Sequence, residues 1–272
     1  MSGPAGKRFL WRIFLSELIG TALLVFAGLS VVIFMWGSGS PVALVLPHEG
    51  LRRLINGFLF GAIGALIALS PVGRVSGAHI NPVVTMGFWL MRKLDPRVSL
   101  VYVFGQLAGA CAGALPLLVW GSMGRSVAFG ATLPGKGFTT MIVLYGEVVT
   151  TFTMVSLLVI FLGFREIRRF TPALFPPLYA FMVWAEAPIS GTGTNPARSL
   201  GPALISGEWQ GWWIFWLGPL LGSLLALSAC SFLAKRIEVA KLYYFDSDRD
   251  GLFRRMGRSD QRGRKEYAAA AK

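Results

Sequence analysis

Long apolar runs, separated by short polar interruptions, follow one another along most of the chain. A helix needs roughly 20 apolar residues to cross the hydrocarbon core of a bilayer, and six of the runs approach or exceed that length. The pattern therefore predicts an all-α membrane protein surrounded by a lipid bilayer. The six expected spans are residues 9–36, 51–72, 98–120, 138–164, 171–189 and 209–233.

Two shorter apolar segments, 81–91 and 195–206, lie before the third and the sixth span. Each is about half the length needed to cross a bilayer. Each also begins with Asn-Pro, which is typical of a helix start, because Asn is a preferred N-cap and Pro is preferred at the first helical position. We expect two half-helices that enter the membrane without crossing it.

The chain also repeats itself. The motif Ser-Gly-x-x-x-Asn-Pro occurs at 76–82 and again at 190–196, although the whole chain has only three asparagines. Two further patterns recur in the same order: Glu-x-x-x-Thr at 17–21 and 147–151, and Gly-x-x-x-Gly at 105–109 and 218–222. Because each copy holds three full spans, the second copy enters the membrane from the opposite side. This predicts an inverted repeat whose broken helices meet near the midplane.

The expected division of the chain follows from these repeats. It comprises an N-terminal segment (1–8), a first repeat (9–120, with the half-helix 81–91), a connecting loop (121–137), a second repeat (138–234, with the half-helix 195–206) and a basic tail (235–272). The repeats end before the tail. We therefore expect the tail to be solvated and to lie outside the pore.

Composition supports a membrane protein, with 54% hydrophobic and 14% charged residues. The net charge of +13 is compatible with nucleic-acid binding, but its placement argues against such a partner. Basic residues gather at the N-terminus, around 74–97, at 165–169 and in the tail, and the positive-inside rule then places both termini in the cytoplasm. The expected location is a plasma membrane or a bacterial inner membrane. The two cysteines lie in apolar runs and there are only two histidines, so we expect neither a metal or other cofactor nor an enzyme.

The paired Asn-Pro boxes, each opening a half-length helix, resemble those of the aquaporin (major intrinsic protein) family, over roughly residues 8–235. One departure is that the first box reads Asn-Pro-Val where the family has Asn-Pro-Ala. The resemblance implies a passive channel for water that excludes protons and ions, assembled as a homotetramer with one pore in each subunit. Small neutral solutes such as glycerol, urea and hydrogen peroxide remain open as further substrates.

Both boxes are candidate pore-lining elements. The N-terminal end of a helix carries partial positive charge, so two half-helix starts meeting at the midplane would repel cations. The asparagine side chains would present NH₂ groups to the lumen, and the loops before them would present carbonyl oxygens. The alternative is that both asparagines act only as N-caps. The box residues are Asn81, Pro82, Val83, Asn195, Pro196 and Ala197.

Arg198 has no counterpart in the first copy, where Val84 stands. A lone arginine inside a membrane is costly and marks a functional site by default. By resemblance it is the arginine of the family's narrow outer filter. The resemblance places Phe60, Val183 and Thr192 in the same filter, although Pro71 reads as a one-residue insertion between Phe60 and the first box. Ordinary packing remains the alternative for Phe60 and Val183.

Two features of the filter disagree about its substrate. Val183 stands where water-selective relatives have histidine, which favours a wider and less polar neck. Ser199 stands where glycerol-conducting relatives have aspartate, which favours water.

Three more residues are assigned to the support of the loops. Glu17 and Glu147 are buried acids that, by resemblance, hold the loop backbone behind the half-helices; a proton relay is the rival interpretation. His79 is expected to support the first loop, with a place in the cytoplasmic vestibule as the alternative.

Two other functions stay open. An inverted repeat with broken helices also builds ion- or proton-coupled secondary transporters. A membrane-packing protein with a vestigial pore would share the same pattern.

Overall fold

The computed structural model describes residues 4–237 and 240–242, and all the regular structure in that part of the chain is helical. The six long helices are α1 (Pro4–Trp36), α3 (Glu49–Leu69), α6 (Pro96–Ala114), α8 (Thr140–Gly163), α9 (Thr171–Ser190) and α11 (Ile214–Ala229). The shorter helices are α2 (Val42–Val45), α4 (Pro71–Ser76), α5 (Pro82–Leu90), α7 (Gly121–Arg125), α10 (Pro196–Ser206) and α12 (Ser231–Ala234). Short 3₁₀ helices cover Leu115–Trp120, Ala128–Gly130 and Arg168–Phe170.

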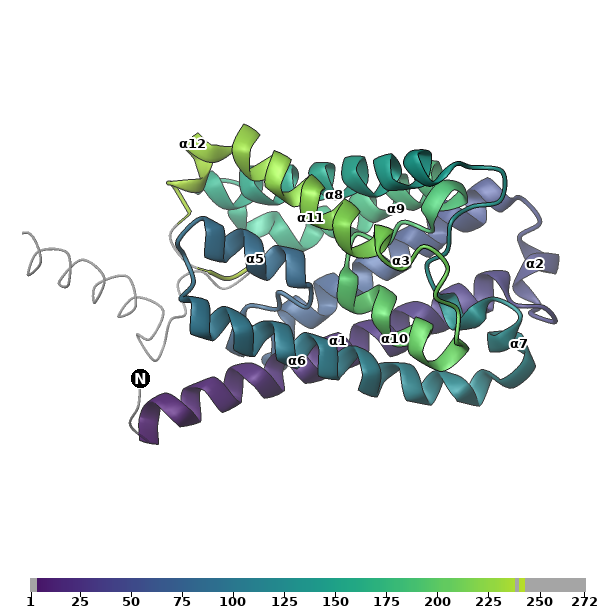
Figure 1. Cartoon of the computed structure of the whole chain (residues 1–272), viewed down its shortest axis with the longest axis horizontal. Helices are drawn as coiled ribbons and strands as arrows, with labels where there is room; N and C mark the ends of the chain where they lie inside the picture. Colours follow the sequence, from purple (N-terminus) through teal and green to yellow (C-terminus); the bar gives the residue numbers. More distant parts are fainter. Residues whose placement is uncertain (1–3, 238–239, 243–272) are drawn as a thin grey trace, which may run out of the picture.

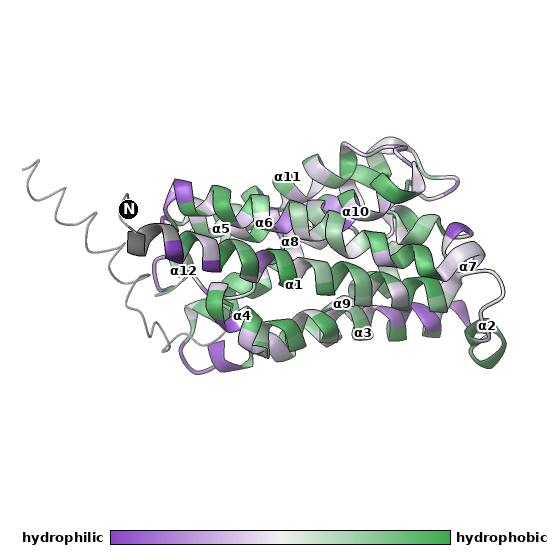
Figure 2. Cartoon of the chain, turned by 90° about the horizontal axis from the view of Figure 1, so that it is seen from below, coloured by the Kyte–Doolittle hydropathy of each residue, from purple (hydrophilic) through white to green (hydrophobic). Residues whose placement is uncertain are grey.

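The long helices run lengthwise beside one another (Figure 1). Among the described residues, four helical segments are long and apolar enough to cross a membrane: Arg8–Trp36, Glu49–Leu69, Pro96–Arg125 and Thr140–Gly163. Helix α11 is a shorter apolar helix. Hydrophobic residues dominate the middle of the bundle and hydrophilic ones gather toward its two ends (Figure 2). The expected architecture, an all-α membrane fold with six spans and two half-helices, is confirmed.

The inverted repeat is visible in the helix pairs. Helix α1 packs against α6 in the first repeat, and the corresponding α8 packs against α11 in the second. Helices α3 and α9 hold equivalent places in the two repeats and pack against each other across the centre. The half-helices α5 and α10 point into the bundle from opposite ends (Figure 1), so the loops that precede them meet inside it.

Glycines of the two Gly-x-x-x-Gly patterns let these helix pairs approach closely, because small residues allow one backbone to lie against another. A Cβ atom added at Gly109 would lie 2.3 Å from the carbonyl oxygen of Leu18, and one at Gly222 would lie 2.5 Å from that of Val148. Both distances are too short for any side chain, so backbone lies directly against backbone.

A third glycine pair escaped the sequence analysis. Added Cβ atoms at Gly57 and Gly61 of α3 would lie 2.2 Å and 2.4 Å from the carbonyl oxygens of Tyr179 and Phe175 on α9. The two helices therefore touch along a backbone seam, and Phe60 lies on α3 between its two glycines. Gly57 and Gly61 have the same four-residue spacing as the two Gly-x-x-x-Gly patterns found in the sequence. Unlike those patterns, this one does not recur on α9, the corresponding helix of the second repeat.

The second span is shorter than predicted. Helix α3 ends at Leu69, and the hydroxyl of Ser70 then caps a new helix by accepting the N–H of Gly73 at 3.2 Å. Pro71 occupies the first turn of α4, where its missing N–H costs nothing. Ser76 is the last helical residue of α4, so the irregular loop begins at Gly77.

The sixth span also differs from its prediction. The span was predicted to begin at residue 209, but α11 begins only at Ile214, so Trp209, Trp212 and Trp213 precede it. At the other end a break at Cys230 separates α11 from α12.

The start of the tail is packed against the first repeat, contrary to the expectation that the whole tail is solvated. The N–H of Leu242 donates to the carbonyl of Gly77 at 3.1 Å, and Lys241 Nζ donates to the carbonyl of Arg74 at 3.2 Å. Lys241 is only 4% exposed. The remaining predictions for the tail concern residues outside the described part of the chain.

Candidate pore and selectivity filter

The two loops before the half-helices share an unusual backbone. Gly77 and Gly191 have positive φ angles of 91° and 81°, as expected for helix C-caps. Non-glycine residues in both loops adopt the left-handed region as well, at equivalent places: Ala78 (54°), Ile80 (42°), Thr192 (54°) and Thr194 (49°). This conformation is uncommon and costly for side chains that branch at Cβ, so the surrounding structure must hold the loops in place.

Two buried glutamates hold them. Glu17 accepts the hydroxyl of Ser76 at 2.5 Å and the backbone N–H groups of His79 and Ile80 at 3.1 and 2.7 Å. Glu147 repeats this arrangement in the second half. It accepts the hydroxyl of Ser190 at 2.5 Å and the N–H groups of Gly193 and Thr194 at 2.6 and 2.8 Å. Hydrogen bonds to an ionised acceptor are stronger than neutral ones, so each glutamate is able to offset the strain of one loop.

Two details of this support were not predicted. Gln106 donates to Glu17 at 2.7 Å and to the hydroxyl of Thr85 at 2.9 Å, and its only signal in the sequence is a polar residue inside an apolar span. The second is the role of Gly193, which is not among the residues that have a positive φ angle. A Cβ atom there would lie 3.0 Å from the carboxylate of Glu147, so close approach is the reason for this glycine.

His79 is buried inside the first repeat, at 1% exposure. Its ring stacks on Phe88 with centroids 4.6 Å apart, and its two nitrogens lie 3.1 Å from the hydroxyl of Thr85 and 3.1 Å from the carbonyl of Ala240. Its side chain therefore packs between the loop, α5 and the tail. The contact with Ala240 links the loop to the packed start of the tail.

The asparagines of the two boxes cap their half-helices and also bind each other's loops. Asn81 Oδ1 accepts the N–H of Val83 at 3.0 Å, and Asn195 Oδ1 accepts those of Ala197 and Arg198 at 3.0 and 3.3 Å. Asn81 Nδ2 donates to the carbonyl of Thr194 at 3.0 Å, and Asn195 Nδ2 donates to that of Ile80 at 2.8 Å. Pro82 and Pro196 follow as first helical residues. The two helix starts are thus fastened together inside the bundle.

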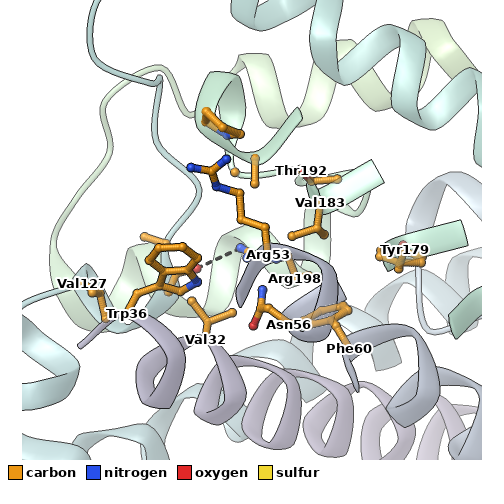
Figure 3. Close-up of a pocket in the computed structure, with 15 residues that line it drawn as sticks. Val32, Trp36, Arg53, Asn56, Phe60, Val127, Tyr179, Val183, Thr192 and Arg198 are labelled. Atoms are coloured by element: carbon orange, nitrogen blue, oxygen red, sulfur yellow. Dashed lines mark hydrogen bonds between the residues drawn. The ribbon is translucent and has the colours of Figure 1, made fainter. Parts of the chain in front are cut away.

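The four filter candidates meet at one cavity of about 300 Å³ (Figure 3). Phe60 comes from α3, Val183 from α9, Thr192 from the second loop and Arg198 from the first turn of α10. Arg198 is 6% exposed, and its Nη1 donates to the carbonyl of Gly130 at 2.9 Å. Its guanidinium carbon lies 5.9 Å from the centre of the Phe60 ring. The connecting loop therefore helps to orient the arginine.

Several lining residues were missed by the sequence analysis. The spacing of four along each helix would have found two of them, because Asn56 lies one turn before Phe60 and Tyr179 lies one turn before Val183. Arg53 lies a further turn back on α3. None of the lining residues is acidic, and two of them are arginines, so the cavity suits neutral molecules better than cations. The residues that were missed are Val32, Trp36, Arg53, Asn56, Val127, Gly130, Ala131, Tyr179, Ala187, Pro188 and Gly191.

The fold and this cavity define a passive membrane channel built from an inverted repeat. The family model described as "Major intrinsic protein" matches residues 5–229. The probable aquaporin PIP2-7 of Oryza sativa subsp. japonica is 36% identical over 248 residues, covering 87% of this chain and 83% of that protein. The lens fiber major intrinsic protein of Gallus gallus is 32% identical over 226 residues, with 79% of each covered.

Among solved structures, the aquaglyceroporin from Plasmodium falciparum matches with a TM-score of 0.66 and 20% identity, over 83% of this chain and 96% of that one. At that identity the match supports the fold alone. The family match covers most of the chain. The chain belongs to the major intrinsic protein family: it is a passive channel for water and small solutes, and not an enzyme.

Proposed function

We propose that the cavity is the narrow outer filter of a water pore and that Phe60, Val183, Thr192 and Arg198 form it. The observation that carries this proposal is that four residues from four separate segments line one cavity. Arg198 supplies fixed hydrogen-bond donors, while Phe60 and Val183 supply apolar walls. A cavity with these two kinds of wall admits a neutral molecule that hydrogen-bonds to Arg198 on one side and contacts apolar side chains on the other.

The proposed path continues inward to the two boxes. Backbone carbonyls of the loops accept hydrogen bonds from water, and the amides of Asn81 and Asn195 donate to it. Two half-helix N-termini meet there, and their partial positive charges oppose the entry of cations and hydronium. The same barrier is generally described for aquaporin-type pores. No cofactor takes part in this mechanism.

The proposed solute range extends beyond water. The valine at position 183 offers no hydrogen-bonding partner and little bulk, so the neck is expected to pass a small neutral solute such as glycerol, urea or hydrogen peroxide. A secondary transporter and a vestigial pore, which the sequence alone left open, are disfavoured by membership of the family.

We further propose a homotetramer in a plasma or bacterial inner membrane, with both termini cytoplasmic. The basic segments at 165–169 and 235–236 support this orientation, since they lie on the side of the membrane to which the positive-inside rule assigns the N-terminus. The tetramer rests on membership of the family.

Shrinkage of proteoliposomes in a stopped-flow instrument tests the function. A channel accelerates water efflux over protein-free vesicles, needs no ion gradient and has a low activation energy. Acceleration that depended on an imposed proton or sodium gradient would favour the transporter. Equal rates with and without protein would leave only a vestigial pore. Parallel assays with each of the three solutes define the range.

A further inference from the structure

Residues 240–242, called the strap from here on, are the part of the tail that packs against the first repeat. Ala240, Lys241 and Leu242 are 1%, 4% and 5% exposed, although they belong to a strongly basic segment that follows the last membrane helix. The strap lies at the end of the bundle that carries the N-terminus and α12 (Figure 1). In the proposed orientation this end faces the cytoplasm, so the strap lies at the inner end of the pore.

The inverted repeat indicates which surface the strap covers. In the motif Ser-Gly-x-x-x-Asn-Pro, Gly77 is the counterpart of Gly191. Gly191 lines the outer cavity and is partly exposed. Because the two loops enter the bundle from opposite ends, Gly77 and the following Ala78 hold the corresponding place at the inner end. Both are buried there, and Ala78 is only 1% exposed.

The strap occupies this place at the inner end. A Cβ atom added at Gly77 would lie 2.7 Å from the Cα atom of Lys241, so the backbone of the strap lies directly on the loop. The N–H of Leu242 donates to the carbonyl of Gly77 at 3.1 Å. That carbonyl belongs to the loop whose carbonyl oxygens are proposed to accept hydrogen bonds from water. The strap therefore takes the position and the acceptor that a water molecule needs there.

Two further hydrogen bonds hold the strap in place. Lys241 Nζ donates to the carbonyl of Arg74 at 3.2 Å, and His79 Nε2 donates to the carbonyl of Ala240 at 3.1 Å. Each hydrogen bond contributes little net stability, because a released partner bonds to water instead. A short terminal segment held in this way is able to detach locally while the helices stay folded.

We propose that the strap is an autoinhibitory element that closes the inner mouth of the pore when it is bound and opens it when it is released. This inference rests on the proposed function, since it concerns the inner end of the same pore. The bound and released strap are two states in equilibrium, so a shift between them changes the permeability without any change at the filter. A segment that only supported the first loop would act in the opposite direction, because its loss would disorder the loop and lower the permeability.

The test compares two truncated chains in proteoliposomes. One chain ends at Ile237 and lacks the strap, whereas the matched control ends at Leu242 and retains it. We expect the chain that ends at Ile237 to conduct water about threefold faster or more per inserted protein. The reason is that loss of the three hydrogen bonds moves the population toward the open state.

A pair of single substitutions in the full-length chain tests the same contact. Leu242→Pro removes the N–H that donates to Gly77, since proline has no backbone donor. Leu242→Ala is the matched control, because it shortens the same side chain and keeps the N–H. We expect the proline variant to conduct water faster than both the parent and the alanine variant.

The outcomes separate the strap from the function as a whole. If the parent and both truncated chains conduct water no faster than protein-free vesicles, the proposed function is wrong. If water is conducted but the chain that ends at Ile237 is no faster than the one that ends at Leu242, the strap does not close the pore and this inference is overturned. If the shorter chain fails to insert, the two Leu242 variants decide. A faster proline variant supports closure by the strap, and an equal or slower one overturns it.

Discussion

Asn81 and Asn195 each donate a side-chain hydrogen bond to the carbonyl that directly precedes the other residue. Asn81 Nδ2 lies 3.0 Å from the carbonyl oxygen of Thr194, and Asn195 Nδ2 lies 2.8 Å from that of Ile80. The two halves of the inverted repeat are thereby joined by a reciprocal pair of bonds. The same amides cap the half-helices, so capping and contact between the halves are combined in one side chain.

This relationship predicts the effect of removing either amide. Asn81→Asp or Asn195→Asp replaces a donor with an anion that faces a carbonyl oxygen, so the bond is lost and a buried charge is added. We expect water permeability per inserted protein to fall about tenfold or more, because the carboxylate repels the carbonyl oxygen that the amide held and leaves a buried charge without a partner. The shrinkage of proteoliposomes in a stopped-flow instrument measures this permeability. Gln210→Glu, at an exposed position, is the control for the added charge. A folded variant that conducts at the parent rate would contradict the pore-lining role of that asparagine.

The second prediction concerns the neck. Val183→His adds bulk and a hydrogen-bonding ring opposite Arg198, so the passage of glycerol, urea and hydrogen peroxide should be suppressed while water continues to pass. Solute and water flux are compared on the same vesicles for parent and variant. If the parent excludes all three solutes and Val183→His changes nothing, the assignment of Val183 to the filter fails.

Thr192→Cys provides an independent probe of the same place. Thr192 lines the filter cavity, so a thiol there should make the channel sensitive to block by mercurial compounds, reversible with excess thiol. The parent has Cys111 and Cys230, neither of which lines this cavity, and it should be comparatively resistant. Equal sensitivity of parent and variant would show that Thr192 is not reached from the pore.

Glu186 gives a prediction about stability. Its carboxylate is 6% exposed, packs against Gly146 and has no hydrogen-bond partner for either oxygen among the described residues. A buried charge without a partner costs more than a buried neutral amide, so Glu186→Gln, which removes the charge at nearly constant shape, should raise the free energy of unfolding by about 1 kcal/mol. For a protein of this size, that corresponds to a melting temperature higher by about 2–4 °C per kcal/mol.

The melting temperature in detergent is the measurement for this variant. Glu208→Gln, at an exposed site, is the matched control and should change little. An unchanged or lower value for Glu186→Gln would mean that the carboxylate is paired after all.

The packed start of the tail leads to the fifth prediction. A chain ending at Ile237 loses the bonds from Leu242 to Gly77, from Lys241 to Arg74 and between Ala240 and His79. Each bond contributes about 0.5–1.5 kcal/mol, so the melting temperature should fall. Water permeability should persist, since every residue lining the filter precedes the cut.

A chain ending at Leu242 retains all three contacts and serves as the control for this truncation. A shorter chain that folds and inserts but is impermeable would show that residues 240–242 belong to the pore.

The sequence predicted the features that depend on local rules. The half-helices begin where expected, because an N-cap asparagine followed by proline specifies a helix start without any tertiary information. The end of α3 was missed, although Ser70-Pro71 is an N-cap followed by proline, the same kind of signal that begins both half-helices. The pattern of apolar residues predicts which segments form buried helices. It does not predict the residue at which one helix ends and the next begins.

Residues brought together by tertiary structure were harder to predict. Gln106 is a polar residue within an apolar stretch of α6, and nothing near it in the sequence indicates that it binds Glu17 and Thr85. The resemblance supplied Phe60, Val183, Thr192 and Arg198, and the structure places all four on one cavity. Contacts of the tail with Gly77 and His79 join residues more than 160 positions apart, so no local pattern could reveal them.

The backbone seam between α3 and α9 has a consequence for how this channel is able to diverge. Because main chain touches main chain at Gly57 and Gly61, the separation of the two helices does not depend on the size of any side chain in the contact. Phe60 and Val183 project from this fixed frame. If they form the filter as proposed, we expect that replacing either one would change the solute range while the spacing of the helices stays as it is.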